Sequence, residues 1–412
     1  MATFSGKFHY STDPPRDGPC QFSFTSETCT VIPSSGPAIT FDLGDVDIAV
    51  RNDWDLVLTL FTGRHLTLRQ FGAVFDRMAG EFIAAWRARA IHCLILEDLE
   101  RVGTFTGSAA IAPDPPVAAE IHLFKSNIAV LPLASTPYQW RLAEVDAIGF
   151  SEETYAVSLR SGDQRLVVSK LGKRTDEFHG ALQGQFDEMR QQSAAAMHET
   201  FPFLDPEALE QLLLTMPEGR SVAFARLDKI HPGLITAIVK RAVSESLRPY
   251  FEALRAKSLA GSIMVGYKFI RDDEQEEEQT DEQDQKDPLF FWFFFPLAGA
   301  NGRHSGLAAW EAGTGSGRAT YFFRTHQSGE AAEHVEGAMQ KLTQGLALVN
   351  FRREPIYLSD DSLAQTAKFH RYAIGCRKLP ILRDLRADFA GRAIHSSLEE
   401  WTTQVENIVQ KC

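Results

Sequence analysis

The sequence lacks the long apolar segments that place a chain in a membrane. Its longest strongly apolar run, Leu289–Leu297, has nine residues, whereas a helix needs about 20 to cross a bilayer. Met1–Tyr10 has no basic stretch followed by an apolar one, which is the pattern of a signal or transit peptide. We therefore expect no membrane span and no targeting segment.

Cysteine is scarce, and its spacing forms no motif. The five cysteines are odd in number and contain no CxxC pair, so neither a disulfide framework nor a zinc site is indicated. Unpaired cysteines are typical of a reducing compartment. We expect a cytoplasmic protein.

Compact catalytic and cofactor motifs are absent as well. The twelve histidines form no HxH or HExxH pattern, and the chain has no GxSxG or GxGxxG. Gly313–Gly317 lacks the lysine of a phosphate-binding loop, which favours a hairpin loop, and Cys93 in an apolar helix is expected to be buried. We predict no catalytic residue, no metal ligand and no cofactor. An enzyme whose site residues are scattered along the chain stays an alternative, because only a folded structure reveals such a site.

The composition indicates a folded, acidic protein. Hydrophobic residues make up 44% of the chain and the formal net charge is −12. That apolar content is enough for real cores, whereas the negative charge argues against nucleic-acid binding. The oligomeric state is not indicated.

Two segments in the first half of the chain resemble each other. Thr3–Gly6 recurs as Thr104–Gly107, and a series of single residues recurs 99 positions later. The matched pairs are Val31 with Val130, Pro33 with Pro132, Leu43 with Leu142, Val46 with Val145, and Asp47 with Asp146. Weak matches in a common order predict a duplicated domain.

Each copy has the periodicity of strands followed by a helix. Trp54, Leu56 and Leu58 alternate with other residues, which is typical of a half-buried strand. A change of phase at Gly44–Asp45 predicts a β-bulge. After Gly72 and Gly172 the period becomes helical, with Phe75, Met78, Phe82 and Trp86 on one face in the first copy and Phe178, Leu182, Phe186 and Met189 in the second.

This order of short antiparallel strands and one amphipathic helix resembles the pleckstrin-homology (PH) superfold. The resemblance covers about half of the chain, is architectural, and includes a large aromatic residue, Trp86, in the closing helix. It implies two PH-like β-barrels, each closed by its C-terminal helix. If Phe75 pairs with Phe178, the equivalent of Trp86 is Met189, and the second copy lacks the aromatic residue. Another small β-barrel or a curved α+β sheet is the rival interpretation.

The lipid-binding residues that the PH resemblance would imply do not carry over. Members of the family that bind phosphoinositides have a basic cluster in the first hairpin. Here that hairpin has Lys7, His9 and Arg16 among acidic residues in the first copy, and Ser108–Glu120 has no basic residue in the second. An anionic membrane is therefore not the expected ligand of these copies.

The second half of the chain is predicted to be helical and then α+β. Asp205-Pro206-Glu207 has the pattern of a helix start, and further helices are expected at 232–243, 246–259, 328–350 and through most of 362–412. Leu289–Leu297 is predicted to be a buried central strand that ends near Phe295, before Pro296. Gly306–Ala312 and Arg318–Thr325 would be its neighbours. A third, diverged PH-like copy is an alternative for this region.

The predicted fold class is α+β throughout. The expected boundaries are 1–98 and 99–200 for the two PH-like copies, 201–260 for a helical segment, and 261–412 for an α+β domain with an acidic disordered loop at 272–287.

The acidic run Asp272–Asp287 is the sharpest remaining feature. Its ten acidic residues and one lysine contribute −9 to the net charge, and such a run repels itself and buries no core. One interpretation is a solvated loop, and the other is a contact for a basic partner or for the chain's own basic helices. The possible partner contacts are Asp272, Asp273, Glu274, Glu276, Glu277, Glu278, Asp281 and Glu282.

These patterns favour a non-catalytic protein-interaction scaffold with a protein partner. One alternative is a protein that binds an anionic ligand or membrane surface through basic helices within Arg220–Lys257 and Lys368–Arg392. A minor alternative is a binder of basic partners similar to eukaryotic histone chaperones, which combine tandem PH-like domains with an acidic segment.

Overall fold

The computed structural model describes residues 2–270, 289–299, 302–313, 318–325 and 332–411. The chain divides into two compact units, one of residues 1–186 with 359–379 and one of residues 187–358 with 380–412. Antiparallel sheets and helices occur in both units, so the chain is α+β, as the sequence predicts.

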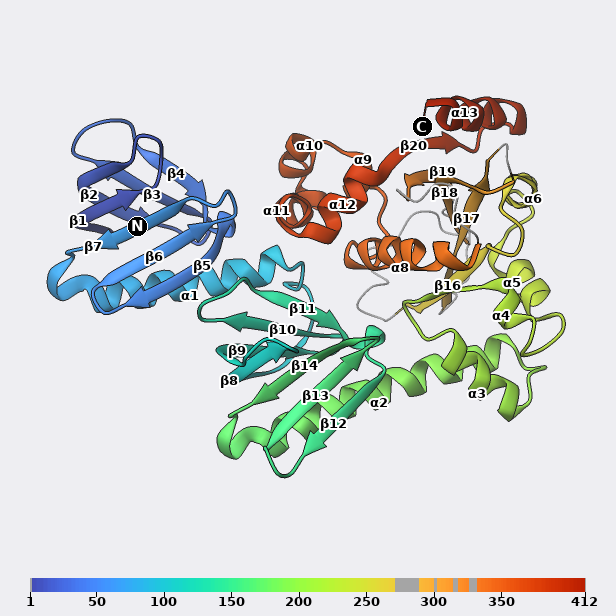
Figure 1. The fold of residues 1–412 in the computed structure, drawn as a ribbon, viewed down its shortest axis with the longest axis horizontal. Helices are drawn as coiled ribbons and strands as arrows, with labels where there is room; N and C mark the ends of the chain where they lie inside the picture. Colours follow the sequence, from blue (N-terminus) through green and yellow to red (C-terminus); the bar gives the residue numbers. More distant parts are fainter. Residues whose placement is uncertain (1, 271–288, 300–301, 314–317, 326–331, 412) are drawn as a thin grey trace. The chain divides into compact units, whose positions relative to one another are not determined.

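The first module consists of a seven-stranded antiparallel sheet followed by a helix (Figure 1). The strand order is β4-β3-β2-β1-β7-β6-β5. The strands are β1 (Thr3–Tyr10), β2 (Arg16–Phe24), β3 (Thr28–Pro33), β4 (Ile39–Asp42), β5 (Val46–Asn52), β6 (Asp55–Leu60) and β7 (His65–Arg69), and the helix is α1 (Phe75–Cys93). The short 3-10 turn η1 (Leu43–Asp45) joins β4 to β5, where the sequence predicted a β-bulge.

The second module repeats this order as β11-β10-β9-β8-β14-β13-β12, followed by α2 (Thr175–Thr200). Its strands are β8 (Arg101–Ile111), β9 (Val117–Phe124), β10 (Asn127–Pro132), β11 (Tyr138–Arg141), β12 (Ala147–Ser151), β13 (Ala156–Ser161) and β14 (Gln164–Ser169). Within the described strands, neither sheet has its first and last members paired. Each sheet is therefore open, and the two closed barrels that we expected are not confirmed.

The backbone explains why the sequence offset between the modules varies. The β5–β6 turn has two residues between the paired Asn52 and Asp55, whereas the β12–β13 turn has four between Ser151 and Ala156. The left-handed residue before each helix is Gln70 (φ 60°) in one module and Lys170 (φ 58°) in the other. The helices therefore align at an offset of 100.

This alignment corrects the predicted pairing of the helices. Phe186, and not Met189, stands at the position of Trp86, and both aromatic residues are buried. The sequence pairing of Phe75 with Phe178 failed because one apolar stripe matches another equally well after a shift of three residues.

A glycine in β1 and its equivalent in β8 make room for the residue that leads into each helix. A Cβ atom on Gly6 would lie 2.7 Å from the Phe71 ring, and one on Gly107 would lie 2.8 Å from Leu171 and 2.6 Å from the carbonyl oxygen of Ser169. Such distances are shorter than the van der Waals contact distance of non-bonded atoms. The repeated glycine thus has a steric cause that is the same in both modules.

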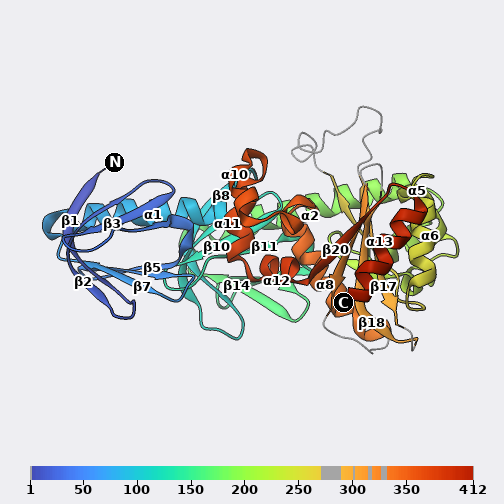
Figure 2. The same ribbon diagram turned by 90° about the horizontal axis from the view of Figure 1, so that it is seen from above.

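Helix α1 runs along the first sheet and continues beyond it (Figure 2). Its apolar side packs into the core of the first module, where the Phe82 ring lies 5.8 Å from Phe22 and 5.3 Å from Phe24. Its last turn packs against the second module, in a cluster of Ala90, Ile91, Leu94, Leu96, Phe124, Ala129 and Leu131. Arg87 also pairs with Glu120 of β9 at 2.9 Å. One helix therefore contributes to the core of the first module and to an apolar cluster with the second.

The same unit contains a segment from far along the chain. Residues 359–379 form α10 (Asp360–Gln365), η5 (Ala367–Phe369) and α11 (His370–Lys378). Helix α11 contacts α1 and η1 of the first module. No periodicity in the sequence indicated this contact.

The second unit is built on a six-stranded antiparallel sheet of order β15-β16-β17-β18-β19-β20. The strands are β15 (Ser221–Ala223), β16 (Met264–Phe269), β17 (Leu289–Ala298), β18 (His304–Ala312), β19 (Ala319–Arg324) and β20 (Phe389–Ile394). The helices are α3 (Pro206–Thr215), α4 (Phe224–Leu227), α5 (Leu234–Ala242), α6 (Arg248–Lys257), α8 (Ala332–Leu348), α9 (Glu354–Tyr357), α12 (Pro380–Asp388) and α13 (Leu398–Lys411). The order differs from that of the first two sheets, so this region does not share their topology.

Several predictions for this unit need correction. Strand β17 continues through Pro296, which pairs with Ala308 beside a register shift; such an irregularity tolerates the missing N–H of proline. Its neighbours are β16 and β18, whereas β19 pairs with β18. Strand β20 lies in a region predicted to be helical. The helix start at Asp205 is confirmed, because its carboxylate accepts a hydrogen bond from the Ala208 amide at 2.8 Å.

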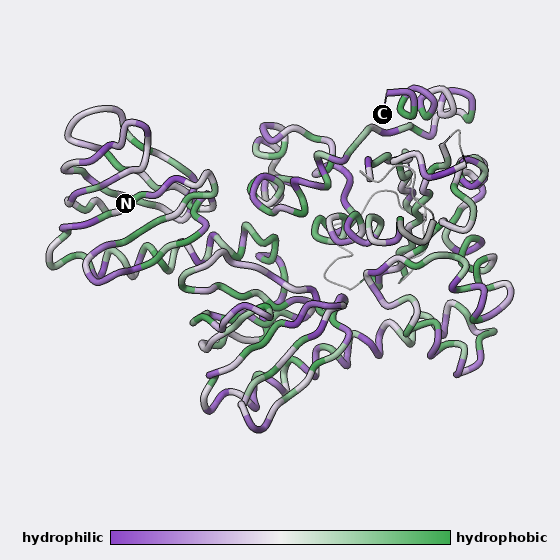
Figure 3. The backbone as a smooth tube through the Cα atoms, viewed as in Figure 1, coloured by the Kyte–Doolittle hydropathy of each residue, from purple (hydrophilic) through white to green (hydrophobic). Residues whose placement is uncertain are grey.

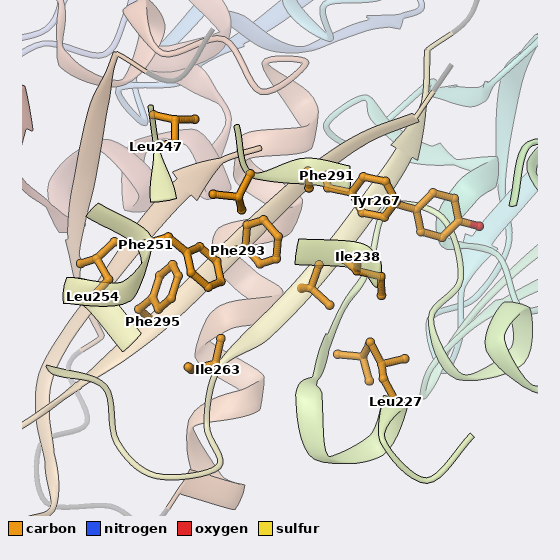
Figure 4. Packing of buried hydrophobic residues seen from close by; sticks show 14 of the residues in the cluster. Leu227, Ile238, Leu247, Phe251, Leu254, Ile263, Tyr267, Phe291, Phe293 and Phe295 are labelled. Carbon is orange, nitrogen blue, oxygen red and sulfur yellow. The ribbon is translucent and has the colours of Figure 1, made fainter. Parts of the chain in front are cut away.

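The core of the second unit explains the uninterrupted aromatic run. Alternate residues Phe291, Phe293 and Phe295 point to one face of β17, where Phe251 of α6 lies 5.1 Å from both Phe293 and Phe295 (Figure 4). Trp292 on the other face lies 4.2 Å from Phe351. Both faces are covered, so both sets of alternating residues are apolar.

Within the described residues, no helix is long and apolar enough to cross a membrane. Figure 3 shows hydrophilic and hydrophobic residues following one another in short stretches along the described backbone.

Candidate functional site

An acidic turn on the first module is the candidate site. It consists of Asp42, Asp45 and Asp47, which flank or belong to η1. The Asp42 carboxylate accepts a hydrogen bond from the Gly44 amide at 2.7 Å and thereby caps the turn. It also accepts two bonds from Arg89 of α1, at 3.1 and 2.9 Å. This bidentate pair fixes the turn to the helix.

Helix α11 binds to the acidic turn through its last two residues. The Lys378 ammonium lies 3.2 Å from Asp47 Oδ1 and donates to the carbonyl oxygens of Gly44 and Val46 at 2.8 and 2.9 Å. Arg377 pairs with Asp45, and its guanidinium lies 5.4 Å from the centre of the Phe61 ring. The Lys378 side chain, which is 9% exposed, thus satisfies two carbonyl oxygens at the turn.

An apolar contact completes this interface. A Cβ atom on Gly44 would lie 2.7 Å from Cys93 Sγ and 3.0 Å from Ile374 Cγ2, so the helix approaches the bare backbone of the turn. Tyr372, Ile374 and Cys376 of α11 are all buried. Apolar burial beside paired charges is the composition of a specific protein–protein contact.

Burial governs the titration of groups at this site. It raises the pKa of Asp45, while the charge of Arg377 acts in the opposite direction. It also raises the pKa of the Cys93 thiol to about 11, against the smaller effects of Lys378 and Arg89. The acidic turn is therefore a desolvated surface whose carboxylates depend on specific cations.

The second module does not reproduce this site. The positions of Asp42 and Asp45 are occupied by Arg141 and Glu144, which pair with each other at 3.6 Å. Asp146, at the position of Asp47, accepts a hydrogen bond from the Gly162 amide at 2.7 Å. The acidic turn is thus a property of the first module.

The site residues predicted from the sequence are not part of this geometry. Asp272, Asp273, Glu274, Glu276, Glu277, Glu278, Asp281 and Glu282 lie outside the described residues, as does most of Gly313–Gly317. The basic stretch Lys368–Arg392 is divided between the two units. Arg386 donates to the Pro355 carbonyl at 2.5 Å, and the Arg392 guanidinium lies 4.1 Å from the centre of the Tyr357 ring. These cations have roles within the fold.

The basic helices within Arg220–Lys257 differ from the stretch Lys368–Arg392, because most of their cationic side chains are exposed. Arg226 pairs with Glu336 at 2.8 Å, and Arg255 lies 3.8 Å from Glu252. The exposed basic residues of this stretch are Arg226, Lys229, Lys240, Arg241, Arg248, Arg255 and Lys257.

The second unit contains a buried polar cluster that the sequence did not indicate. Thr320 Oγ1 lies 2.7 Å from Glu311 Oε2 and 3.0 Å from His395 Nε2, and it accepts a hydrogen bond from Trp401 Nε1 at 3.0 Å. A hydroxyl, an imidazole and a carboxylate are the components of a nucleophilic triad. Thr320 is 0% exposed, however, so a substrate does not reach its hydroxyl in this conformation. The cluster connects β18, β19 and α13.

Two other kinds of candidate site are a metal centre and a small-molecule cavity. Among the described residues, no group of three or more His, Cys, Asp or Glu side chains is arranged to hold a metal ion. A cavity of about 490 Å³ lies between the end of β19, α8 and α12, with an apolar lining that includes Leu342, Ile381 and Leu385. Lys341 and Asp384 pair across its rim at 3.6 Å.

Comparison with known proteins gives little further information. No family model and no curated protein matches the chain. The C-terminal domain of an unknown protein from Leishmania infantum is similar at 14% identity and a TM-score of 0.22, over 25% of this chain and 97% of that one. The linker-DH/PH domains of p115-RhoGEF are similar at 7% identity and a TM-score of 0.20, over 29% of this chain and half of that one. At these TM-scores neither similarity identifies a fold or a function.

Proposed function

We propose that the chain is a non-catalytic protein-interaction scaffold whose N-terminal unit is built on two PH-like modules. The proposal is supported by one observation above others, which is the binding of α11 to the acidic turn. There two carboxylates, of Asp45 and Asp47, and an apolar contact bind a helix to the first module, although some 280 residues separate that helix from the module. A surface that recognises one protein segment is suited to recognising others.

The shared helix α1 supports the scaffold interpretation. Because α1 lies in the core of the first module and its last turn packs against the second, relative movement of the modules would open the cluster of Ile91, Leu94 and Phe124. Exposing such residues costs about 1.5–3 kcal/mol each. The two modules would therefore present their surfaces to partners in a fixed relation.

Identification of partners tests this proposal. The tagged full-length chain is cross-linked in its native source, purified, and analysed by mass spectrometry, and each candidate partner is then produced and titrated against the chain. We expect at least one protein to bind stoichiometrically and to cross-link to residues of the first unit. A chain that purifies alone and cross-links only to itself contradicts the proposal.

The acidic run Asp272–Asp287 would add a contact for a basic partner. Its deletion should reduce the recovery of such a partner, because the run contributes −9 of the net charge of −12 and attracts cationic surfaces. Replacement of the run with a neutral linker of equal length is the control for altered chain length. Unchanged recovery would show that this contact does not exist.

A second candidate function is the binding of an anionic ligand or membrane surface. The observation in its favour is the exposure of basic residues on α5 and α6, including Lys240, Arg248 and Lys257. Flotation with anionic and with neutral vesicles tests it, since electrostatic attachment requires the anionic lipid and weakens with salt. A binder of basic partners similar to histone chaperones remains a minor proposal, which titration with basic proteins addresses.

A further inference from the structure

Each module presents an exposed aromatic side chain at the same turn. Trp54 lies in the β5–β6 turn and is 65% exposed, and Tyr155 lies in the β12–β13 turn and is 61% exposed. We call these residues the tip aromatics. The sequence interpretation placed Trp54 in the alternating pattern of a half-buried strand, but β6 begins only at Asp55. Large aromatic residues are usually buried because of their apolar area, and exposure at equivalent turns calls for a cause.

Each tip aromatic packs against another aromatic ring of its own module. The Trp54 ring lies 6.1 Å from Phe75, the first residue of α1. The Tyr155 ring lies 6.0 Å from Phe150 in an edge-on arrangement, and Phe150 stacks on His179 of α2 at 5.1 Å. Supported side chains lose less conformational freedom when a ligand binds.

The backbone at Tyr155 provides independent evidence. Its φ of 47° lies in the left-handed region, which suits glycine or asparagine and is unfavourable for a bulky side chain. Strained residues of this kind cluster at sites of function.

Carboxylates flank both tip aromatics. Asp53 and Asp55 adjoin Trp54, and Glu152 and Glu153 precede Tyr155 in its turn. None of the four takes part in an ion pair identified within the described residues, whereas the nearby Arg51 is paired with Asp76 at 2.6 Å. An aromatic face with adjacent carboxylates is complementary to a cation on a flexible stem.

We infer that the two turns bind a protein segment that carries lysine or arginine side chains. This inference rests on the proposed scaffold function and specifies the chemistry of one class of partner. The cation of the partner would lie over the exposed ring of Trp54 or Tyr155, and a neighbouring carboxylate would pair with it. Two equivalent turns on one unit would let a segment with two separated basic groups bind at both. The carboxylates repel anionic headgroups, so a protein segment and not an anionic membrane is the occupant.

The test uses the full chain and a fluorescent peptide rich in lysine and arginine. Fluorescence anisotropy gives its affinity for the unmodified chain, for Trp54→Ala, for Tyr155→Ala and for the double variant. We expect the double variant to bind about tenfold more weakly or worse, because each cation–π contact contributes a measurable part of the affinity. Trp54→Phe and Tyr155→Phe retain a ring and should retain most of the binding. Leu214→Ala, which removes a side chain that is 65% exposed in α3, is the matched control.

A photo-crosslinking version of the same peptide locates the contact. Cross-links at the turns Asp53–Asp55 and Glu152–Tyr155 support the inference. Equal affinity of the double variant, or cross-links confined to other parts of the chain, overturns it. Loss of vesicle binding in the double variant without loss of peptide binding would assign the tip aromatics to a membrane and would also overturn it. A partner that binds the chain independently of both rings leaves the scaffold proposal standing and removes only this inference.

Discussion

Trp86 and Lys378 donate hydrogen bonds to the same carbonyl oxygen. The indole Nε1 of Trp86 and the ammonium Nζ of Lys378 each lie 2.9 Å from the oxygen of Val46. Trp86 belongs to helix α1 of the first module, whereas Lys378 lies 332 residues after Val46. The Val46 carbonyl thus accepts one hydrogen bond from the core of its own module and one from the distant helix α11.

The effects of Trp86→Phe and Lys378→Met should be coupled. Either substitution leaves Val46 one donor, and the double variant leaves it none, so the double variant should lose about 1 kcal/mol more than the sum of the single effects. Hydrogen exchange of α1 and β5 measures the free energies of opening. Additive effects would show that the two bonds are independent.

Lys378→Met alone should weaken the binding of α11 to the acidic turn. The substitution removes the pair with Asp47 and two carbonyl contacts from a side chain that is 9% exposed, and it should cost about 2–3 kcal/mol. Hydrogen exchange should accelerate in residues 370–378 and at Gly44. Lys257→Met, at an exposed lysine, is the control, with an expected effect below about 0.5 kcal/mol.

The two equivalent glycines should respond differently to rescue. Gly6→Ala and Gly107→Ala should each destabilise their module by about 1–3 kcal/mol through overpacking. A second substitution, Phe71→Leu, should rescue Gly6→Ala, because the near atoms belong to that side chain. Leu171→Val should fail to rescue Gly107→Ala, because the Ser169 carbonyl oxygen remains at 2.6 Å. Urea unfolding of the four variants provides the measurement.

Glu120 should stabilise the first unit in a pH-dependent manner. The hydrogen bond from His122 and the charge of Arg87 lower the pKa of Glu120 below its usual value of 4.5. An acid with a lowered pKa in the folded state contributes stability above pH 4.5, and this contribution is lost as the pH falls through the folded-state pKa. The difference in unfolding free energy between the unmodified chain and Glu120→Gln should therefore be largest near neutral pH and vanish in acid. A difference that is constant with pH would contradict this assignment.

Thr320 should be required for the folding of the second unit, and its hydroxyl should be the required group. Thr320→Val keeps the shape but leaves Glu311 and Trp401 without their shared partner, at a cost of about 2–4 kcal/mol. Thr320→Ser keeps the hydroxyl and should cost less, about 1 kcal/mol. Thermal unfolding distinguishes the two. Equal losses would show that the methyl group, and not the hydrogen bonds, is important.

The thiols of the described cysteines should be unreactive in the folded chain. Burial raises the pKa of both Cys20 and Cys93 to about 11 and that of Cys29 well above its usual value, and Cys376 is buried. Because the thiolate is the reactive form, a disulfide reagent at mildly alkaline pH should label these four only after denaturation. Rapid labelling of Cys93 in the native chain would contradict the observed packing of α11.

Local patterns in the sequence determined much of the fold. Alternating residues located β6 in the first unit, the pattern at Asp205 located a helix start, and the continuous run at Leu289 indicated a strand covered on both faces. Each of these signals arises from neighbours along the chain, where the period of side-chain directions is fixed by the backbone.

The tertiary structure decided what the sequence left open. The equivalence of Trp86 and Phe186 in the two modules was established only by the left-handed residues Gln70 and Lys170, which precede the two helices. The sequence could not establish it, because apolar stripes of the same period match in more than one register. The binding of α11 to the acidic turn, the cluster around Thr320, and the exposure of Trp54 all depend on residues brought together from distant parts of the chain. Contacts of this kind leave no periodic trace in a single sequence, because the partner of each residue is chosen by packing and not by spacing.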